Sequence, residues 1–455
     1  MTAAVLADFG STFTKVTLVE LRSGRLRGRA QSPTTIETDV MIGYQAALDA
    51  ALADAGEPPS LGPRLAASSA AGGLRVAAIG LVEDLTAAAA RQAGLNAGAR
   101  IELVLHGRLG DRHRRLLSEI HPEVVLFCGG TDDGQERIVL DNAAAISAAP
   151  LDSHYVVACN ERIAEQVGQI LARHGSRVDV VANVMPRIGT LDVEPARAAI
   201  SEAFVRHVIQ GKGLSEAPEF VREVMMPTPE AVLRATRLLA GDVGDVVVVD
   251  VGGATTDVHS ATQSSEPTPG IRGPLLPVLP VLRSVQGDLG LRSNAPSVLE
   301  ADREWLLQTL AVDERRAATA VARRAEDPGF VAVEPEDWTT DRALAVACVF
   351  HAVRRHCGHL TVTSRPNQPA RISTDGPDLR HAPLLVGTGG ILVRAPASHE
   401  ILATAIGRCA DRWLTPRAPR FAIDSDYVLA AAGLLAELDP QASLQLMRER
   451  LTEAT

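Results

Sequence analysis

The clearest pattern along the chain is an apolar, β-branched run that ends in Asp-x-Gly and leads into a second apolar run. It occurs at residues 5–16 and again at residues 247–258, and the two stretches align without a gap. An apolar β-branched run predicts a buried strand, and the glycine after it predicts a turn. Two copies in one register predict duplicated halves, each offering a strand–turn–strand hairpin to a shared cleft.

The chemistry of these hairpins centres on the aspartates Asp8 and Asp250. Burying a carboxylate at the end of a strand costs free energy unless the carboxylate contacts a polar partner or a cation. The glycines of the turn permit a close approach to a ligand, and their N–H groups with neighbouring hydroxyls form a donor-rich concavity that suits phosphate. Two acids facing one another would hold a hydrated Mg²⁺, which prefers oxygen ligands. One copy alone is also compatible with an ordinary capped hairpin, whereas the pair favours a ligand site.

Helical and strand-like stretches alternate between residues 83 and 186. Helices are predicted near 84–97, 109–120, 135–148 and 161–173, and strands at 101–105, 124–128, 154–158 and 177–182. This alternation predicts a mostly parallel sheet with crossover helices. Residues 195–239 read as helical, with breaks near Gly211–Gly213 and at Pro227. A boundary near residue 242 follows, which gives a first domain of 1–242 and a second of 243–455.

Two loops within this region are rich in glycine or small residues. Gly129, Gly130, Thr131 and Asp132 follow the strand at 124–128, in the position where open α/β sheets bind ligands. The loop lacks the Lys-Ser/Thr ending of a Walker A motif. Its aspartates fit two roles equally, positioning a water that attacks phosphate or capping the next helix. The loop at 68–73 is either a further ligand loop or a tight bend.

A third glycine turn comes late in the chain. A short strand at 383–386 is followed by Gly387, Thr388, Gly389 and Gly390. Glycines between a strand and the next segment let a flat ring lie against bare backbone. Because the chain also carries the two phosphate-binding hairpins, this turn is expected to bind the adenine and ribose of a nucleotide.

Composition narrows the function classes. The 455 residues carry a net charge of −10, which opposes nucleic-acid binding because that binding depends on Lys and Arg displacing counterions. Five scattered cysteines without a C-x-x-C spacing fit a reduced cytoplasm. We expect a cytoplasmic protein without a membrane span, because the chain has no basic-then-apolar leader and no apolar run of about 18 residues.

These motifs carry a family resemblance. The two hairpins and the late glycine turn resemble the phosphate-1, phosphate-2 and adenosine motifs of the actin-like ATPase superfamily, which includes actin, sugar kinases and heat-shock chaperone ATPases. Nearly the whole chain also resembles the glutamate (methylaspartate) mutase accessory protein family MutL/GlmL, unrelated to the mismatch-repair protein of similar name. The stretches that carry this likeness are 8–15, 37–43, 68–73, 183–186, 250–260 and 287–290. The resemblance implies an α/β, actin-like ATPase fold with two duplicated ribonuclease-H-like lobes around a nucleotide cleft.

The resemblance also implies roles for individual residues. Asp8 and Asp250 would organise Mg²⁺ and take part in catalysis, and Asp257 would orient water or metal. The resemblance places phosphates at Ser11, Thr12, Lys15, Gly252, Gly253, Thr255 and Thr256, and adenosine at Gly387, Gly389 and Gly390. From the residues themselves we also expect nucleotide contacts at Gly10, Thr14, Ala254 and Thr388 in the same turns and, by their position after a strand, at Gly129, Gly130, Thr131 and Asp132. No residue matches the catalytic base of the superfamily.

The implied activity is that of an ATP-binding, ATP-hydrolysing factor that reactivates an adenosylcobalamin-dependent mutase, such as glutamate mutase, by releasing damaged cobalamin. A small-molecule kinase or a hydantoinase- or oxoprolinase-like enzyme is one alternative, because residues 250–257 also resemble the latter families. A nucleotide-binding module without turnover is another. Neither Asp111-Arg112-His113 nor Asp152-Ser153-His154 continues to the glycine of D-x-H-x-x-G, so the cobalamin would belong to the partner. The sequence predicts neither the client nor the oligomeric state.

Overall fold

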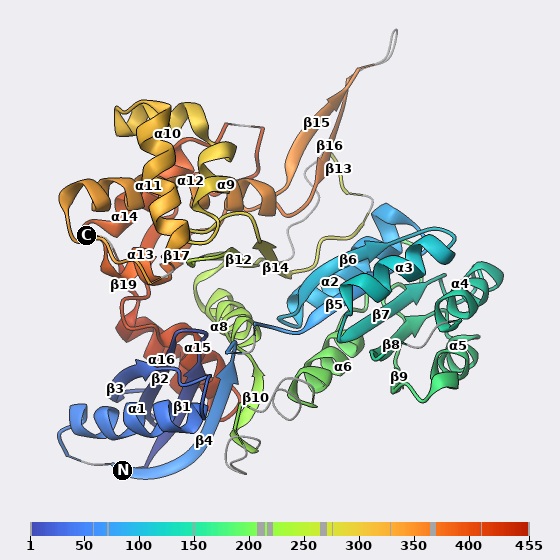
Figure 1. The fold of residues 1–455 in the computed structure, drawn as a ribbon, viewed down its shortest axis with the longest axis horizontal. Coiled ribbons are helices and arrows are strands. Elements are labelled where there is room, and N and C mark those ends of the chain that lie inside the picture. The colour runs from blue at the N-terminus through green and yellow to red at the C-terminus, as the bar shows by residue number, and fades with distance from the viewer. Residues whose placement is uncertain are drawn as a thin grey trace. The chain divides into compact units, whose positions relative to one another are not determined.

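The computed structural model of the chain is shown in Figure 1. It describes all residues except 1, 58, 71, 149–150, 207–213, 216–221, 264–270, 275, 328, 365–369, 411 and 454–455. The predicted break near Gly211–Gly213 therefore lies outside the described residues. The contacts between residues group the chain into two compact units. The first unit is Met1–Val232, Leu275–Leu279 and Gly433–Ala442, and the second is Leu233–Pro274, Pro280–Ala432 and Ser443–Thr455.

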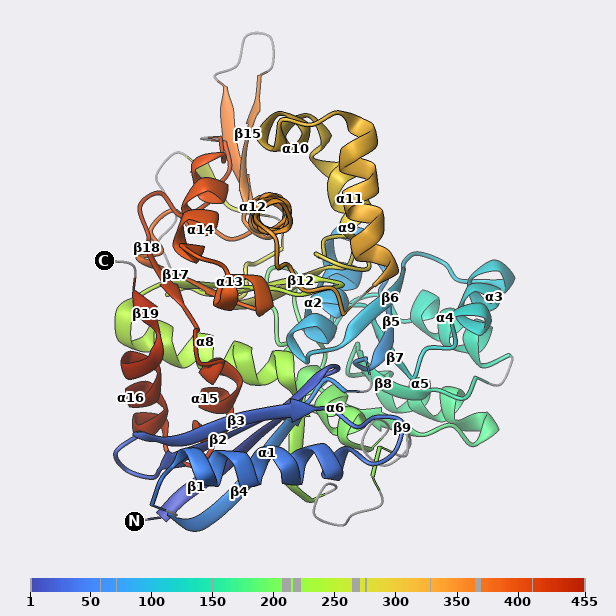
Figure 2. The ribbon, with the colours of Figure 1, turned by 60° about the vertical axis from the view of Figure 1, so that its left-hand side comes forward.

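The first unit contains a five-stranded sheet built around the first Asp-x-Gly hairpin. Its strands are β1 (Thr2–Phe9), β2 (Phe13–Glu20), β3 (Leu26–Pro33), β4 (Ser60–Ser68) and β10 (Val224–Pro227). Their order is β10-β4-β1-β2-β3, with β2 antiparallel to both neighbours and β4 parallel to β1 and β10. Helix α1 (Val40–Asp54) packs across β2 and β3, as Figure 2 shows, and begins where the Asp39 carboxylate accepts from the Met41 amide.

The second unit contains a sheet of the same plan around the second hairpin. Its strands are β11 (Val246–Val251), β12 (Thr256–Ala261), β14 (Val281–Gln286), β17 (Leu384–Thr388), β18 (Arg420–Ile423) and β19 (Thr452–Glu453). The order is β14-β12-β11-β17-β18-β19, with β12 antiparallel to its neighbours and β11, β17 and β18 parallel. Read from β14 to β18, this sheet corresponds strand by strand, in order and direction, to the first sheet read from β3 to β10. The predicted α/β fold with duplicated ribonuclease-H-like lobes is confirmed.

A separate parallel sheet lies within the first unit (Figure 1). Its strands are β5 (Arg75–Ile79), β6 (Arg100–Leu105), β7 (Val124–Gly129), β8 (His154–Cys159) and β9 (Val178–Val180). The order β6-β5-β7-β8-β9 is that of a doubly wound domain. This confirms the parallel sheet that the alternating pattern predicts.

Helices cover both faces of this parallel sheet. They are a π-helical turn (Glu83–Ala87), α2 (Ala88–Asn96), α3 (Asp111–Ile120), α4 (Arg137–Ser147), α5 (Ala164–Leu171), a 3-10 turn (Ala172–His174) and α6 (Glu194–Phe204). Apolar residues of α2 and α6 share one core with one face of the sheet, and those of α3, α4 and α5 share another core with the opposite face. All four predicted helices of this region are present within a few residues of their expected ends.

The remaining helices lie in the second unit or are divided between the two units. Those within the second unit are α9 (Ala295–Ala301), α10 (Arg303–Leu310), α11 (Glu314–Glu326), α12 (Pro335–His356), α13 (Gly390–Arg394) and α14 (Ser398–Gly407). Residues of both units make up α8 (Thr228–Val243), which leads into β11, α15 (Val428–Leu435) and α16 (Pro440–Arg450). A small sheet adds β13 (Ile271–Arg272), β15 (His359–Thr363) and β16 (Arg371–Asp375). The long helix α12 packs its apolar residues against β11 and β12.

Two local expectations differ from the structure. Residues 224–227 were expected to be helical, but they form β10, because they pair with Ala66–Ser68 of β4 and so complete the first sheet. The late strand does not end at residue 386. Gly387 and Thr388 continue β17 because they pair with Val249 and Asp250 of β11, so the turn begins only at Gly389.

Candidate functional site

The first hairpin places a cation directly beside its aspartate. The antiparallel register of β1 and β2 sets Asp8 opposite Lys15. The Lys15 Nζ lies 3.2 Å from Asp8 Oδ2, and the Thr228 hydroxyl donates to Asp8 Oδ1 at 2.6 Å. Both carboxylate oxygens therefore have partners within the first unit. Thr228 is the first residue of α8 and lies 220 positions along the chain, so sequence patterns gave no sign of this contact.

The turn of the first hairpin is compact on one side and open on the other. The Gly10 amide donates to the carbonyl oxygens of Asp8 and Phe13, both at 3.1 Å. A Cβ at Gly10 would lie 2.7 Å from the Phe13 oxygen, so only glycine fits. Ser11 and Thr12 are exposed, as phosphate donors must be.

Thr14, by contrast, is fully buried. Its hydroxyl shares a hydrogen bond of 3.0 Å with the hydroxyl of Thr34, and the Thr34 amide donates to the Thr12 carbonyl. Thr14 thus ties the hairpin to the start of the next segment. The loop at 68–73 also reaches this hairpin, since the Ser69 amide donates to the Phe9 carbonyl at 2.8 Å. Within that loop, residue 71 lies outside the described residues.

The second hairpin places an acid where the first has its cation. The register of β11 and β12 sets Asp250 opposite Asp257, so both side chains emerge on one face of the sheet. Arg283 of β14 is almost fully buried and donates to Asp257 Oδ1 at 2.8 Å. Asp250 and Asp257 together supply the oxygen ligands that a hydrated divalent cation prefers. Arg283 was not anticipated from the sequence, because the charge lies 26 residues away on another strand.

The turn of the second hairpin is held from outside by one short segment. The amides of Leu291 and Arg292 donate to the carbonyls of Gly252 and Gly253 at 3.1 and 2.7 Å. The Asn294 side chain donates to the Ala254 carbonyl at 2.7 Å. In a trans peptide the C=O and the following N–H point in opposite directions.

The three N–H groups that follow those carbonyls therefore point away from the bracing segment. They belong to Gly253, Ala254 and Thr255, and the first two of these residues are exposed. Such a row of backbone donors forms an anion-binding concavity. Thr256 does not contribute to it, because its buried hydroxyl donates to the Leu289 carbonyl at 2.9 Å.

The late glycine turn lies directly against the second aspartate. Gly389 has a φ of 96°, and a Cβ there would lie 2.4 Å from the Val251 carbonyl oxygen and 2.7 Å from Asp250 Oδ1. Only glycine allows this approach. The Thr388 hydroxyl is buried and donates to Asp424 Oδ2 at 3.1 Å, and Asp424 also accepts from the first amides of α15. Gly390 is exposed, with nothing within 4 Å of a Cβ placed on it.

The loop after β7 belongs to the separate parallel sheet. Gly129 and Gly130 have positive φ angles, and Asp132 Oδ1 accepts from the Asn183 side chain at 2.8 Å and from the Glu161 amide at 3.2 Å. Asp132 thus joins the loops that follow β7, β8 and β9. The nucleotide contacts expected of Gly129, Gly130, Thr131 and Asp132 remain a prediction.

Two buried histidines lie behind the second hairpin. Burial lowers the pKa of His356 to about 3, and its ring nitrogens lie 2.7 Å from the Ser284 hydroxyl and 2.9 Å from the Ser260 hydroxyl. Burial, and then the charge of Arg283, hold the pKa of His259 well below its ordinary value. Both rings are therefore neutral near pH 7, and the ring of His356 hydrogen-bonds to the two serines.

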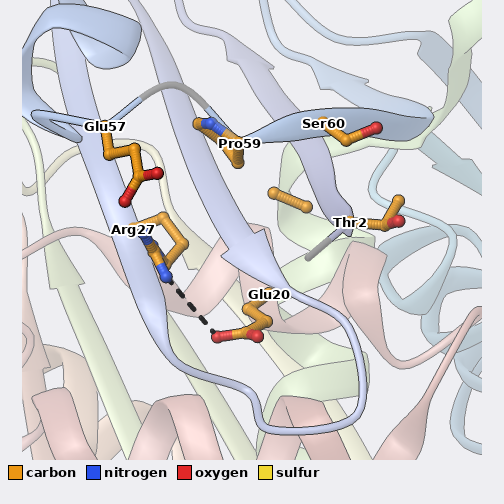
Figure 3. A pocket seen from close by; sticks show the side chains of 7 residues that line it. Thr2, Glu20, Arg27, Glu57, Pro59 and Ser60 are labelled. Carbon is orange, nitrogen blue, oxygen red and sulfur yellow. Dashed lines mark ion pairs between the residues drawn. The ribbon is translucent and has the colours of Figure 1, made fainter.

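A shallow pocket opens at the far end of the first sheet. Figure 3 shows its lining side chains, among them Glu20, Arg27 and Glu57, with an ion pair of 3.8 Å between Arg27 and Glu20. It also contains Thr2, the first residue of β1, whereas Asp8 is near the last. At about 3.3 Å per strand residue the two are roughly 20 Å apart. The pocket is thus separate from the candidate phosphate turn.

The described part of the chain offers neither a metal-binding cluster nor a membrane-spanning helix. It contains no group of three or more His, Cys, Asp or Glu side chains placed to hold a metal ion. Among the helices described, none is both long and apolar enough to cross a bilayer.

Comparison with known proteins covers the whole chain. The family model described as MutL protein matches residues 4–451. Protein MutL of Clostridium tetanomorphum is 37% identical over 464 residues, spanning 100% of this chain and 100% of that protein.

Several solved structures are more distantly similar. Nucleotide-free acetone carboxylase is 14% identical with a TM-score of 0.42, covering 95% of this chain and 70% of that one. Nucleotide-free diol dehydratase-reactivating factor is 11% identical with a TM-score of 0.38, covering 96% and 100%. Xylulose kinase from Bifidobacterium adolescentis is 12% identical with a TM-score of 0.34, covering 100% and 96%. These values are too low to transfer an activity.

Proposed function

The chain belongs to the MutL protein family, and from this premise we propose that it binds ATP with Mg²⁺ and hydrolyses it to reactivate an adenosylcobalamin-dependent mutase. The observation that carries the nucleotide part is the matched pair of Asp-x-Gly hairpins, each at the centre of a ribonuclease-H-like sheet. One hairpin presents a lysine and the other a second acid at the same register position. That combination suits a phosphate chain with its metal.

The residues present fit such a ligand. Asp250 and Asp257 offer carboxylate oxygens on one face, and Gly389 leaves the space beside Asp250 free of a Cβ. The exposed N–H groups of the second turn and the Lys15 ammonium would hold phosphate oxygens. Bound Mg²⁺ supplies charge neutralisation of the phosphates. The chain's own contribution is positioning and a fixed set of donors rather than covalent chemistry.

The contacts of Asp8 give it a second role beside the one predicted at the cation. Its oxygens already contact Lys15 and Thr228, so its charge orients the lysine and the start of α8. We propose that Asp250 and Asp257 contact the cation directly and that Asp8, which also places Lys15, helps to organise it through water.

The mutase partner follows from the resemblance to the MutL/GlmL family. The decisive experiment mixes purified protein, Mg-ATP and a glutamate mutase that has been inactivated by damaged cobalamin. Recovery of mutase activity that requires both ATP and fresh adenosylcobalamin supports the proposal. Phosphate release without any recovery would reject the reactivating role, and transfer of phosphate to a small molecule would establish a kinase instead.

A further inference from the structure

Arg292 lies at the point where the bracing segment meets the phosphate-binding turn. Its amide donates to the Gly253 carbonyl at 2.7 Å, and its Cγ lies 3.4 Å from the position of a Cβ on Gly253. Residue 292 therefore contacts the turn through both main chain and side chain. The position of its backbone sets the direction of the Gly253–Ala254 peptide, and so of the Ala254 N–H.

The guanidinium of Arg292 is itself held on three sides. Nε donates to the Phe330 carbonyl at 2.9 Å, Nη1 to the Leu291 carbonyl at 2.8 Å, and Nη2 to Asp341 Oδ2 at 2.8 Å. A planar fork with fixed donor directions can satisfy all three acceptors, whereas the single ammonium of a lysine cannot. The side chain is a fixed link between the turn and its surroundings.

The anchor at the other end is buried and rigid. Asp341 of α12 is only 1% exposed and also accepts from Arg324 Nε at 2.5 Å. The Phe330 ring lies beneath the guanidinium groups of Arg292, Arg323 and Arg324, at 5.3, 4.5 and 4.8 Å from its centroid. Because Asp341 keeps Arg324 as a partner, loss of Arg292 would not leave this carboxylate uncompensated.

We propose that Arg292 is a positioning residue for phosphate binding, fixing the Gly252–Thr255 turn so that its N–H groups point at the nucleotide. Arg292 acts through the turn, since all three of its guanidinium nitrogens donate to Phe330, Leu291 or Asp341. Pre-set donors stabilise the charge that develops in phosphoryl transfer without reorganising during the reaction. This inference rests on the proposed ATPase function.

The test compares Arg292→Ala and Arg292→Lys with Arg323→Ala as matched control. Arg323 belongs to the same cluster, pairs with Asp337 at 3.2 Å and stacks on Phe330. We expect kcat for ATP hydrolysis to fall at least about tenfold in both Arg292 variants, with the KM for ATP changed by less, and to stay within about twofold in Arg323→Ala. Equal losses in Arg292→Ala and Arg323→Ala would overturn the inference.

A second readout does not depend on turnover. Hydrogen exchange of a peptide covering residues 289–294 should be about tenfold faster in Arg292→Ala than in Arg323→Ala, because the amides of Leu291 and Arg292 donate to the turn and only the former variant frees it. Unchanged exchange would overturn the positioning role even if hydrolysis fell. A wild-type protein without ATP turnover would refute the ATPase and leave the exchange result to decide the role of Arg292. Should Arg292→Ala fail to fold, Arg292→Lys and Asp341→Asn give the same comparison.

Discussion

The two hairpins share a register and differ in the charge they present. In the first, Asp8 stands opposite Lys15, and in the second, Asp250 stands opposite Asp257. In the first hairpin, Lys15 forms an ion pair with Asp8. In the second hairpin, Asp257 forms an ion pair with Arg283 of the neighbouring strand β14. Equivalent positions in a duplicated element have thus acquired opposite signs, which suits one hairpin to phosphate oxygens and the other to a cation.

The turns differ as well. The carbonyls of Gly252, Gly253 and Ala254 are all engaged by a single segment, which pre-orients the donors on the other side. In the first turn the described contacts are the internal bonds of Gly10 and the bond from the Thr34 amide to the Thr12 carbonyl. Duplicated backbones therefore reach different rigidity through what packs against them. The following experiments would break or sharpen this contrast.

The largest effect is expected at the second aspartate. Asp250→Ala should lower ATP hydrolysis by about 100-fold or more, because the cation would lose one of its two carboxylates. The control is Asp245→Ala, whose carboxylate accepts from the Gln263 amide just before β11 starts. Phosphate release measured at saturating Mg²⁺ decides the matter. A rate for Asp250→Ala within a few-fold of wild type would remove this residue from the site.

The contact between the late glycine turn and Asp250 predicts a steep steric effect. Gly389→Ala should reduce the unfolding free energy by roughly 2 kcal/mol, since the added Cβ meets Val251 and the positive φ is strained for alanine. Gly390→Ala adds the same atom into open space and should change stability by no more than about 0.5 kcal/mol. Denaturant unfolding of the two variants measures the difference. Similar values would show that the turn is not packed on Asp250.

Lys15 and Asp257 occupy equivalent positions with opposite charges, so their substitutions should affect the binding of different ligands. Lys15→Ala should raise the KM for ATP about tenfold at unchanged Mg²⁺ requirement, since one charged hydrogen bond is lost. Asp257→Asn should instead raise the Mg²⁺ concentration for half-maximal activity about tenfold at an unchanged limiting rate. Titrations of ATP and Mg²⁺ on both variants separate the two effects. If both variants shifted the same parameter, the division of roles would be wrong.

Acid should weaken the second sheet before the first. Because the pKa of His356 is about 3 in the folded chain and about 6.5 when unfolded, the unfolded state binds an extra proton as pH falls below about 6.5. Stability is then lost down to about pH 3, by roughly 1 kcal/mol between pH 7 and 5.5. The strands of the first sheet contain no histidine.

Hydrogen exchange at pH 7 and 5.5 on wild type and His356→Gln checks this difference. In wild type, amides of β11 and β12 should lose more protection than those of β1 and β2, and the glutamine variant should show a smaller loss. Equal loss in both sheets, or an unchanged pH response in the variant, would contradict it.

The sequence by itself determined the two hairpins and the places of their aspartates. Each hairpin is closed by a three- or four-residue turn, so its strand pattern, its glycine and its aspartate lie within about a dozen residues. Such local pairing leaves a periodic signal that can be read directly. The parallel sheet between β5 and β9 was predictable for the same reason, because helix and strand periods alternate along it.

The tertiary structure decided which side chains the aspartates meet and how the turns are braced. Thr228, Arg283 and Arg292 reach the hairpins from 26 to 220 positions away from the residues they contact, and nothing in their local sequence marks them. Residues 224–227 became a strand only because β4 offered an unpaired edge. Contacts of this kind join residues that are far apart in the sequence. They form only when the whole sheet packs, so no short stretch of sequence can predict them.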